Sequence, residues 1–234
     1  MINLKALWQN ILDYVFPKEC FACKKEGEYL CSECFSRLEL IDKFTCFICN
    51  GPETEKGVCE KCATETGIDR IIIAAKYRNN VAGQIVESFK YDFVQDLASI
   101  LVKILEKQIN RRGLASFMHQ QILLPVPLHK KRLAERGFNQ AEELAKGIGA
   151  LYDCLIENEL LNRVKNTGQQ AKLSRSERFS NIENAFQGNL KTAVPERVVL
   201  VDDVLTSGAT FIQAAKALRQ AGVKEIACLA VCHG

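Results

Sequence analysis

One stretch, residues 197–210, constrains the fold of this chain more than any other. It opens with an apolar run, residues 198–201, made of the valine and leucine side chains that fill buried parallel strands. Two adjacent carboxylates, Asp202 and Asp203, follow at the point where we expect this strand to end. The stretch therefore predicts an α/β protein in which a buried strand carries two acids to the edge of a parallel sheet.

A loop of small and hydroxylated residues comes next and consists of Thr206, Ser207, Gly208, Ala209 and Thr210. Because a helical pattern begins there, the N–H groups of this 206–210 loop and the positive end of the helix can face a phosphate. Gly208 lets the backbone approach closely, and the three hydroxyls can each donate a hydrogen bond. The acids can accept hydrogen bonds from vicinal sugar hydroxyls or from a magnesium-bound water. The whole pattern favours a site for a phosphorylated sugar.

Residues 199–210 resemble, without a break, the phosphoribosyl pyrophosphate (PRPP) signature of type I phosphoribosyltransferases. The resemblance implies the fold of those enzymes, which is a mostly parallel sheet flanked by helices. The alternative is an ordinary buried strand followed by a turn. That alternative leaves two adjacent acids at a strand end unexplained, so the sugar-phosphate site is preferred.

Eight cysteines near the N-terminus form four pairs, and two residues separate the members of each pair. They are Cys20, Cys23, Cys31, Cys34, Cys46, Cys49, Cys59 and Cys62. This gap lets one tight turn aim two thiolates at a tetrahedral ion, so four pairs predict two closed, structural zinc sites. Sequential pairing is preferred, although spacing leaves a cross-braced arrangement open. A redox role is weaker, because four consecutive pairs exceed what an oxidoreductase needs.

Composition and hydropathy favour a cytoplasmic protein. The chain has 11 cysteines in 234 residues, which suits metal binding in a reducing compartment better than disulfides. No apolar run approaches the ~20 residues that span a bilayer, so no membrane insertion is expected. Residues 1–16 predict an amphipathic helix, and Asn10 and Asp13 argue against a secretory signal. The formal net charge of +3 does not by itself indicate nucleic acid.

Apolar runs and helical patterns alternate from about residue 67 onward, which predicts a mostly parallel sheet with ligands beyond the carboxyl ends of its strands. The expected strands are residues 71–77, 122–127, 198–201 and 226–231, and the expected helices are residues 81–105, broken near residue 91, and two more that begin near residues 140 and 210. We expect an N-terminal helix and double zinc ribbon over residues 1–66 and a phosphoribosyltransferase-like domain over residues 67–234.

Two polar segments are candidates for further contacts with an anionic ligand. Residues 128–136 read as a basic loop that leads through Gly137 and Asn139 into a helix, and such a loop can hold an anion. Its alternative is a solvated loop. A long polar insertion from about residue 163 to residue 184 suits a mobile lid, with a short helix beginning at Ser174.

Nearly the whole chain resembles the ComF family of competence proteins. The matching features are Pro17 before the first cysteine, the cysteine pairs, Pro125-Val126-Pro127, Arg136-Gly137-Phe138-Asn139-Gln140, the spaced residues Arg163, Thr167, Gln170, Leu173, Arg178, Asn181, Ala185 and Phe186, and the PRPP signature. The resemblance implies a double zinc ribbon, a phosphoribosyltransferase-like domain and a role in DNA uptake during natural transformation.

By position, the resemblance also implies residue roles. Asp202 and Asp203 would hold the ribose hydroxyls, and the 206–210 loop would bind the 5′-phosphate. Arg136, Gly137 and Asn139 would meet the pyrophosphate. Arg163 and Lys165 would reach over it from the lid as charge builds on the leaving group, normally with magnesium present.

Two functions stay open from the sequence. The first is an enzyme that transfers phosphoribosyl from PRPP to an acceptor that no residue identifies. The second is a non-catalytic PRPP sensor, or a platform for single-stranded DNA and uptake proteins. The acids and the 206–210 loop favour at least PRPP binding in either case, because function depends on the site and not on the fold.

Overall fold

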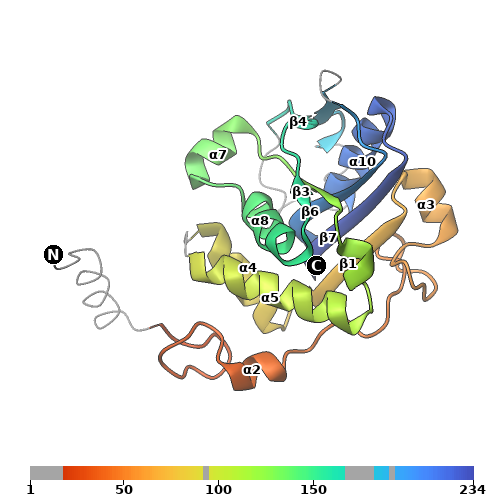
Figure 1. The fold of residues 1–234 in the computed structure, drawn as a ribbon. Coiled ribbons are helices and arrows are strands. Elements are labelled where there is room, and N and C mark those ends of the chain that lie inside the picture. The colour runs from red at the N-terminus through yellow and green to blue at the C-terminus, as the bar shows by residue number, and fades with distance from the viewer. Residues whose placement is uncertain (1–17, 92–94, 167–181, 190–192) are drawn as a thin grey trace. The chain divides into compact units, whose positions relative to one another are not determined.

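Figure 1 shows the computed structural model of the chain, which describes residues 18–91, 95–166, 182–189 and 193–234. The chain separates into two compact units, Met1–Glu39 and Leu40–Gly234. The helix expected over residues 1–16, the short helix expected from Ser174 and most of the expected lid lie outside the described residues.

The described part of the first unit is a small cysteine-rich module. It contains one short helix, α2 (Ser32–Ser36), and an isolated antiparallel bridge between Glu19 and Glu26. Its buried apolar side chains within residues 18–39 are Cys20 and Leu30. Because so little apolar surface is buried there, the module depends on its cysteines to hold a fold.

The second unit is built on a five-stranded, fully parallel sheet with the strand order β1-β7-β6-β2-β3. The strands are β1 (Arg70–Lys76), β2 (Ile122–Pro125), β3 (Leu155–Ile156), β6 (Arg197–Leu205) and β7 (Glu225–His233). A separate antiparallel pair joins β4 (Leu161–Arg163) to β5 (Phe186–Gly188). The two long central strands β6 and β7 are almost wholly buried, as expected for a parallel sheet covered on both faces.

Helices cover both faces of this sheet (Figure 1). The described helices of this unit are α3 (Glu60–Thr66), α4 (Val81–Tyr91), α5 (Gln95–Arg111), α6 (Ala115–Met118), α7 (Lys130–Arg136), α8 (Gln140–Tyr152) and α10 (Ala209–Ala221). On one face α5 packs against both α4 and α8, while α10 contacts α3 and the β4-β5 pair. In the described part of the chain, no helix combines the length and apolar character needed to cross a membrane.

The structure confirms most of the expected elements and corrects two of them. α4 ends at Tyr91 and α5 begins at Gln95, while residues 92–94, where the break was expected, lie outside the described residues. The expected basic loop over residues 128–136 is wrong, because most of it is the helix α7. His129 caps this helix by accepting a hydrogen bond from Lys131 N at 3.2 Å, and Gly137 ends it at a φ of 79°. All seven residues of this segment have a high helix propensity, so it forms a helix although five of them are charged.

The expected end of the central strand is also corrected. β6 runs through both acids to Leu205 because Asp202, Val204 and Leu205 all keep their pairing with β7. The acids are therefore held by the sheet itself, and the 206–210 loop begins one residue after the strand ends.

The second group of cysteines belongs to the same compact unit as the sheet. Phe44, Phe47, Ile48 and Val58 share one hydrophobic core with β1, β6, β7 and α10. The expected division at residue 66 concerns modules of the sequence and stays a prediction, whereas the compact units divide between Glu39 and Leu40.

Candidate functional site

A cavity of about 360 Å³ opens at the carboxyl ends of β1, β6 and β2, and we call it the carboxyl-edge cavity. The predicted residues that line it are Asp202, Asp203, Thr206, Gly208, Ala209, Thr210, Arg136, Asn139 and Arg163. The sheet topology thus brings together residues that lie up to 74 positions apart in the sequence. This is the place where ligands bind in open α/β sheets.

Three predicted site residues do not line the cavity. Ser207 belongs to the loop but its side chain is buried, and its Oγ accepts a hydrogen bond from Ala209 N at 3.4 Å. Gly137 ends α7, and Lys165 is exposed in the segment after β4. Asn139 lines the cavity while capping α8, since its Oδ1 accepts from Ala141 N at 3.2 Å.

The two acids face the cavity in different environments. Asp203 is 9% exposed, and its Oδ2 lies 3.4 Å from Nζ of Lys90. Asp202 is partly exposed, and its Oδ1 accepts a hydrogen bond from Asp203 N at 2.9 Å. Burial, followed by repulsion from Asp203, raises the pKa of Asp202 to about 8, although Lys90 and Arg163 oppose this shift. Burial and the neighbouring carboxylate thus both favour the protonated form of Asp202 in the ligand-free site.

We predict a pH-dependent gain of stability for Asp202→Asn. The folded-state pKa of Asp202 lies above its unfolded value of about 4, so the cost of ionising it appears as pH rises from 4 toward 8 and then stays constant. Thermal unfolding of ligand-free protein should show the variant at the wild-type midpoint at pH 4.5 and about 4 °C higher at pH 8.5, roughly 1–2 kcal/mol after discounting partial exposure. The exposed Glu196→Gln variant is the control, and a constant offset at both pH values would contradict the shifted pKa.

The 206–210 loop turns the chain from β6 into α10 and needs a glycine at its centre. Gly208 caps α10 at a φ of 79°, a conformation that other residues seldom adopt. A Cβ at this position would lie 2.9 Å from Cδ1 of Ile48. The first turn of α10 carries no acidic residue, so no charge within the helix itself opposes an anion at its positive end.

Three arginines form the wall of the cavity that we call the arginine wall: Arg132, Arg136 and Arg163. Burial, followed by the charge of Arg132, lowers the pKa of Arg163 to about 10. Burial, followed by the charge of Arg136, also lowers the pKa of Arg132, and its buried Nη2 has no hydrogen-bond partner among the described residues. Three crowded cations beside a hollow are an arrangement that would suit a multiply charged anion.

Arg132 was not predicted from the sequence to have a role of its own. Its signal is the spacing of four between Arg132 and Arg136, which places both side chains on one face of a helix. That signal is readable only when residues 130–136 are recognised as α7. Arg136 is further held by Gln140, whose Oε1 accepts from its Nη1 at 2.9 Å.

A further wall of the cavity was not predicted and comes from the end of β1 and from α4. Tyr77 donates a hydrogen bond to Glu87, and Nζ of Lys90 lies 5.5 Å from the centre of the Tyr77 ring. The ring of Phe89 lies 5.4 Å from that of Phe138 and ties the end of α4 to the loop before α8. Nothing in local spacing joins these residues, because β1 and α4 meet the acids only in the folded sheet.

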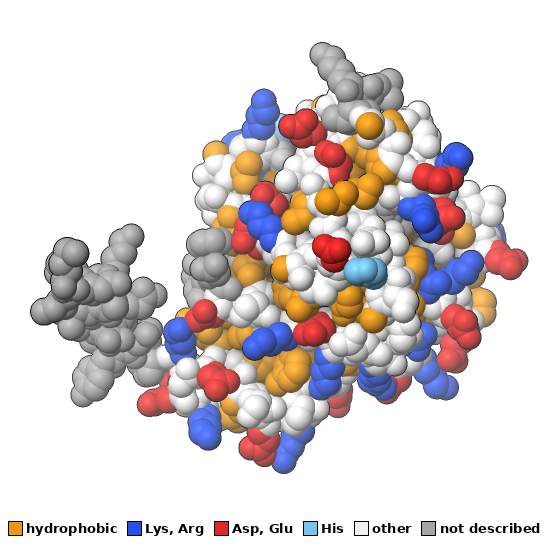
Figure 2. All heavy atoms as spheres, in the orientation of Figure 1, with side chains coloured by type: hydrophobic (Ala, Val, Ile, Leu, Met, Phe, Trp, Pro, Cys, Tyr) orange, Lys and Arg blue, Asp and Glu red, His pale blue; other side chains and the backbone are white. Residues whose placement is uncertain are grey.

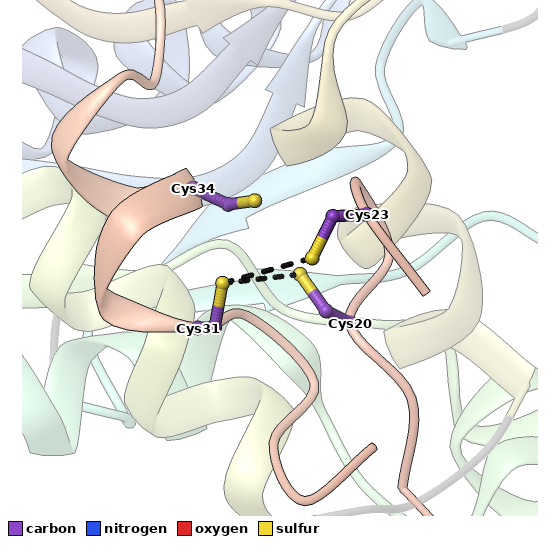
Figure 3. Close-up of side chains that lie close together, drawn as sticks. All are labelled: Cys20, Cys23, Cys31 and Cys34. Carbon is purple, nitrogen blue, oxygen red and sulfur yellow. Dashed lines mark hydrogen bonds between the residues drawn. The ribbon is translucent and has the colours of Figure 1, made fainter. Parts of the chain in front are cut away.

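The cysteines gather into two separate groups. The first cysteine cluster is Cys20, Cys23, Cys31 and Cys34 (Figure 3), and the second is Cys46, Cys49, Cys59 and Cys62. The ligand atoms within each cluster all lie within 4.8 Å of one another, close enough to share an ion at Zn–S distances of about 2.3 Å. The preferred sequential pairing is therefore confirmed, and the cross-braced alternative is wrong.

Comparison with known proteins agrees with both the cysteine clusters and the carboxyl-edge cavity. The family model of the double zinc ribbon domain matches residues 11–66, and that of the phosphoribosyl transferase domain matches residues 133–234. Competence protein F of Haemophilus influenzae is 30% identical over 216 residues, which cover 88% of this chain and 86% of that protein. The chain belongs to the ComF family of competence proteins.

Other ComF-family relatives align over similar lengths. Competence protein ComFC of Bacillus subtilis is 28% identical over 85% of this chain and 81% of its own length. DNA utilization protein YhgH of Escherichia coli K12 is 28% identical over 93% of this chain and 97% of its own length. The resemblance stated from the motifs is thus confirmed, and so is a phosphoribosyltransferase fold with two zinc-ribbon sites.

Proposed function

We propose that this ComF-family protein binds PRPP in the carboxyl-edge cavity and transfers its phosphoribosyl group to an acceptor during DNA uptake. The observation that carries the proposal is the meeting of two acids, the 206–210 loop and the arginine wall around one cavity. The names of the relatives, competence proteins and DNA utilization proteins, support the biological role. The cytoplasm is the proposed location, since the eight cysteines of the two clusters must stay reduced to bind zinc.

Each part of the cavity suits one part of PRPP. Asp202 and Asp203 accept hydrogen bonds from the two ribose hydroxyls, and the 206–210 loop donates N–H and O–H groups to the 5′-phosphate. The arginine wall takes the diphosphate. When the bond from C1 to the diphosphate oxygen breaks and a bond from the acceptor forms, negative charge grows on the leaving group, and the guanidinium groups stabilise it.

Magnesium fits this arrangement as a companion of PRPP. Two adjacent carboxylates beside a diphosphate site offer the oxygen donors that this ion prefers. When bound, magnesium neutralises part of the diphosphate charge. The carboxylates would hold its water shell, while Lys90 already supplies a positive charge to Asp203.

We predict that Arg132→Met lowers the affinity for PRPP and leaves the affinity for ribose 5-phosphate nearly unchanged. The substitution removes one charged donor to the diphosphate, so PRPP affinity should fall about 10- to 100-fold. Affinity for ribose 5-phosphate, which lacks the diphosphate, should change less than about twofold. Calorimetric titration of both ligands measures this, with the exposed Lys131→Met variant of the same helix as the control. An equal loss for both ligands would contradict the assignment of the arginine wall.

Turnover is tested by pyrophosphate release from PRPP against a panel of nucleobases, amines and single-stranded DNA. Release stimulated by one acceptor supports the enzyme. PRPP binding without release by any acceptor, together with salt-sensitive affinity for single-stranded DNA, supports the alternative of a sensor or a DNA-binding platform. On the face of the second unit seen in Figure 2, charges of both signs are interspersed, so that face favours no extended nucleic-acid track.

A further inference from the structure

The second cysteine cluster contains a turn that reaches the 206–210 loop. Phe47 and Ile48 fill the two-residue gap between Cys46 and Cys49, and both are buried. Cδ1 of Ile48 would lie only 2.9 Å from a Cβ placed on Gly208, so its methyl group packs directly against the glycine. The ring of Phe47 lies 5.1 Å from that of His233, at the end of β7.

Other contacts fix this turn on the sheet. Phe47 N donates to Gly57 O at 3.0 Å, and Ile71 N donates to Lys56 O at 2.7 Å, which joins the cluster to β1. Gly57 leaves no room for a side chain, since a Cβ there would lie 2.2 Å from Ile71 O. Ile48 also shares the buried core with Leu205 and other residues that flank the loop. These hydrogen bonds hold the turn against β1, and Ile48 points from the turn toward the loop.

The corresponding turn of the first cysteine cluster differs. Phe21 and Ala22 fill the gap between Cys20 and Cys23, Ala22 is exposed, and the Phe21 ring lies 6.2 Å from that of Tyr29 in the same unit. The chain therefore offers two turns with the same metal-ligand spacing and different neighbours, which supplies a matched control.

We propose that Ile48 is a positioning residue for the 206–210 loop, and that metal binding by the second cysteine cluster holds it there. Two thiolates on one ion fix the turn between them, so the metal sets the place of Ile48. Gly208 adopts a left-handed conformation in which its backbone leaves room for no side chain, and Cδ1 of Ile48 packs against it on that side. Removing this contact should let the loop backbone move. The inference rests on the proposed function for the identity of the phosphate ligand.

The first test compares Ile48→Ala, Ile48→Leu and Phe21→Ala by calorimetry with ribose 5-phosphate, and by metal analysis. Ile48→Ala keeps all eight thiolates and should keep two zinc ions, but its affinity should fall about tenfold or more as the loop amides leave their positions. Ile48→Leu retains a methyl group that can reach Gly208 and should restore most of the affinity. Phe21→Ala should bind like wild type. Wild-type affinity in Ile48→Ala would overturn the proposal.

The second test uses Cys23→Ser and Cys49→Ser. Each replaces the second cysteine of its cluster, and both cysteines are exposed. Each should lower the zinc content by about one ion per chain. Only Cys49→Ser should weaken ribose 5-phosphate binding. Equal affinities for two folded variants that have each lost one ion would contradict the role of the second metal site.

A readout without ligand keeps this inference separate from the proposed function. Backbone amide exchange at residues 206–210 should rise about fivefold or more in Ile48→Ala and stay unchanged in Phe21→Ala. If wild-type protein bound no phosphorylated sugar while this exchange pattern held, the positioning role would stand and the proposed ligand would fall. Unchanged exchange in Ile48→Ala would remove the positioning role whatever the ligand.

Discussion

Replacing both acids, Asp202→Asn with Asp203→Asn, will abolish PRPP binding and leave the fold intact. With PRPP and magnesium bound, each ionised acid accepts a hydrogen bond, and a hydrogen bond to a charged group contributes about 1.5–3 kcal/mol. Asparagine keeps one carbonyl acceptor but loses the charge and presents an NH2 donor, so affinity should fall at least about 100-fold. Asparagine has nearly the same volume, and Asp202→Asn removes a charge that burial disfavours. Asp203→Asn removes the ion-pair partner of Lys90, which offsets this gain, so the sheet should stay folded with a similar stability. Calorimetry with magnesium measures the affinity, and thermal unfolding checks the fold.

A double variant of exposed acids, Glu183→Gln with Glu196→Gln, makes the same change of net charge away from the cavity. It should bind PRPP within about twofold of wild type, since exposed charges contribute little. Wild-type affinity in the double asparagine variant would show that the acids do not hold the ribose. Loss of binding in both double variants would point to a general charge effect.

Metal analysis will find two zinc ions per chain, and the two clusters will differ in what their loss does to the sheet. Cys20 and Cys46 are both fully buried. Cys46→Ser should lower the unfolding midpoint of the second unit by about 10 °C or more, because a structural zinc ion contributes folding free energy and this cluster shares the core with the sheet. Cys20→Ser, in the first unit, should leave that midpoint unchanged.

Freshly reduced protein without any zinc would contradict this prediction at once. An equal fall of the midpoint for both serine variants would show that the two compact units do not unfold independently. The unfolding should be followed by near-ultraviolet signals of buried tyrosine and phenylalanine side chains of the second unit, such as Tyr152, Phe89 and Phe211, which report tertiary packing.

The fold class and half of the site could be predicted because their signals are local. Residues 198–210 contain a strand, two acids, a loop and a helix start in one contiguous segment, so spacing alone orders them. The cysteine clusters are local in the same sense, since each gathers four thiolates from 15 or 17 consecutive residues. This short reach made sequential pairing the preferred prediction, and the structure decided it against the cross-braced arrangement that spacing had left open.

The other half of the site could not be predicted because it depends on the packed sheet. Lys90 reaches Asp203 only because β1 lies beside β7 in the same sheet as β6. Ile48 touches Gly208 across 160 positions of sequence, and no spacing rule relates a zinc turn to a phosphate loop. The prediction of a loop at α7 was wrong because it relied on the many lysines and arginines of the segment, although these residues favour a helix.

The central claim is that the carboxyl-edge cavity binds PRPP, and a calorimetric titration of the wild-type protein tests it most directly. With magnesium present and two zinc ions per chain, we predict one PRPP bound per chain, displaced by ribose 5-phosphate and separately by inorganic pyrophosphate. No binding at millimolar PRPP, in protein that still unfolds cooperatively and retains its zinc, would contradict the account.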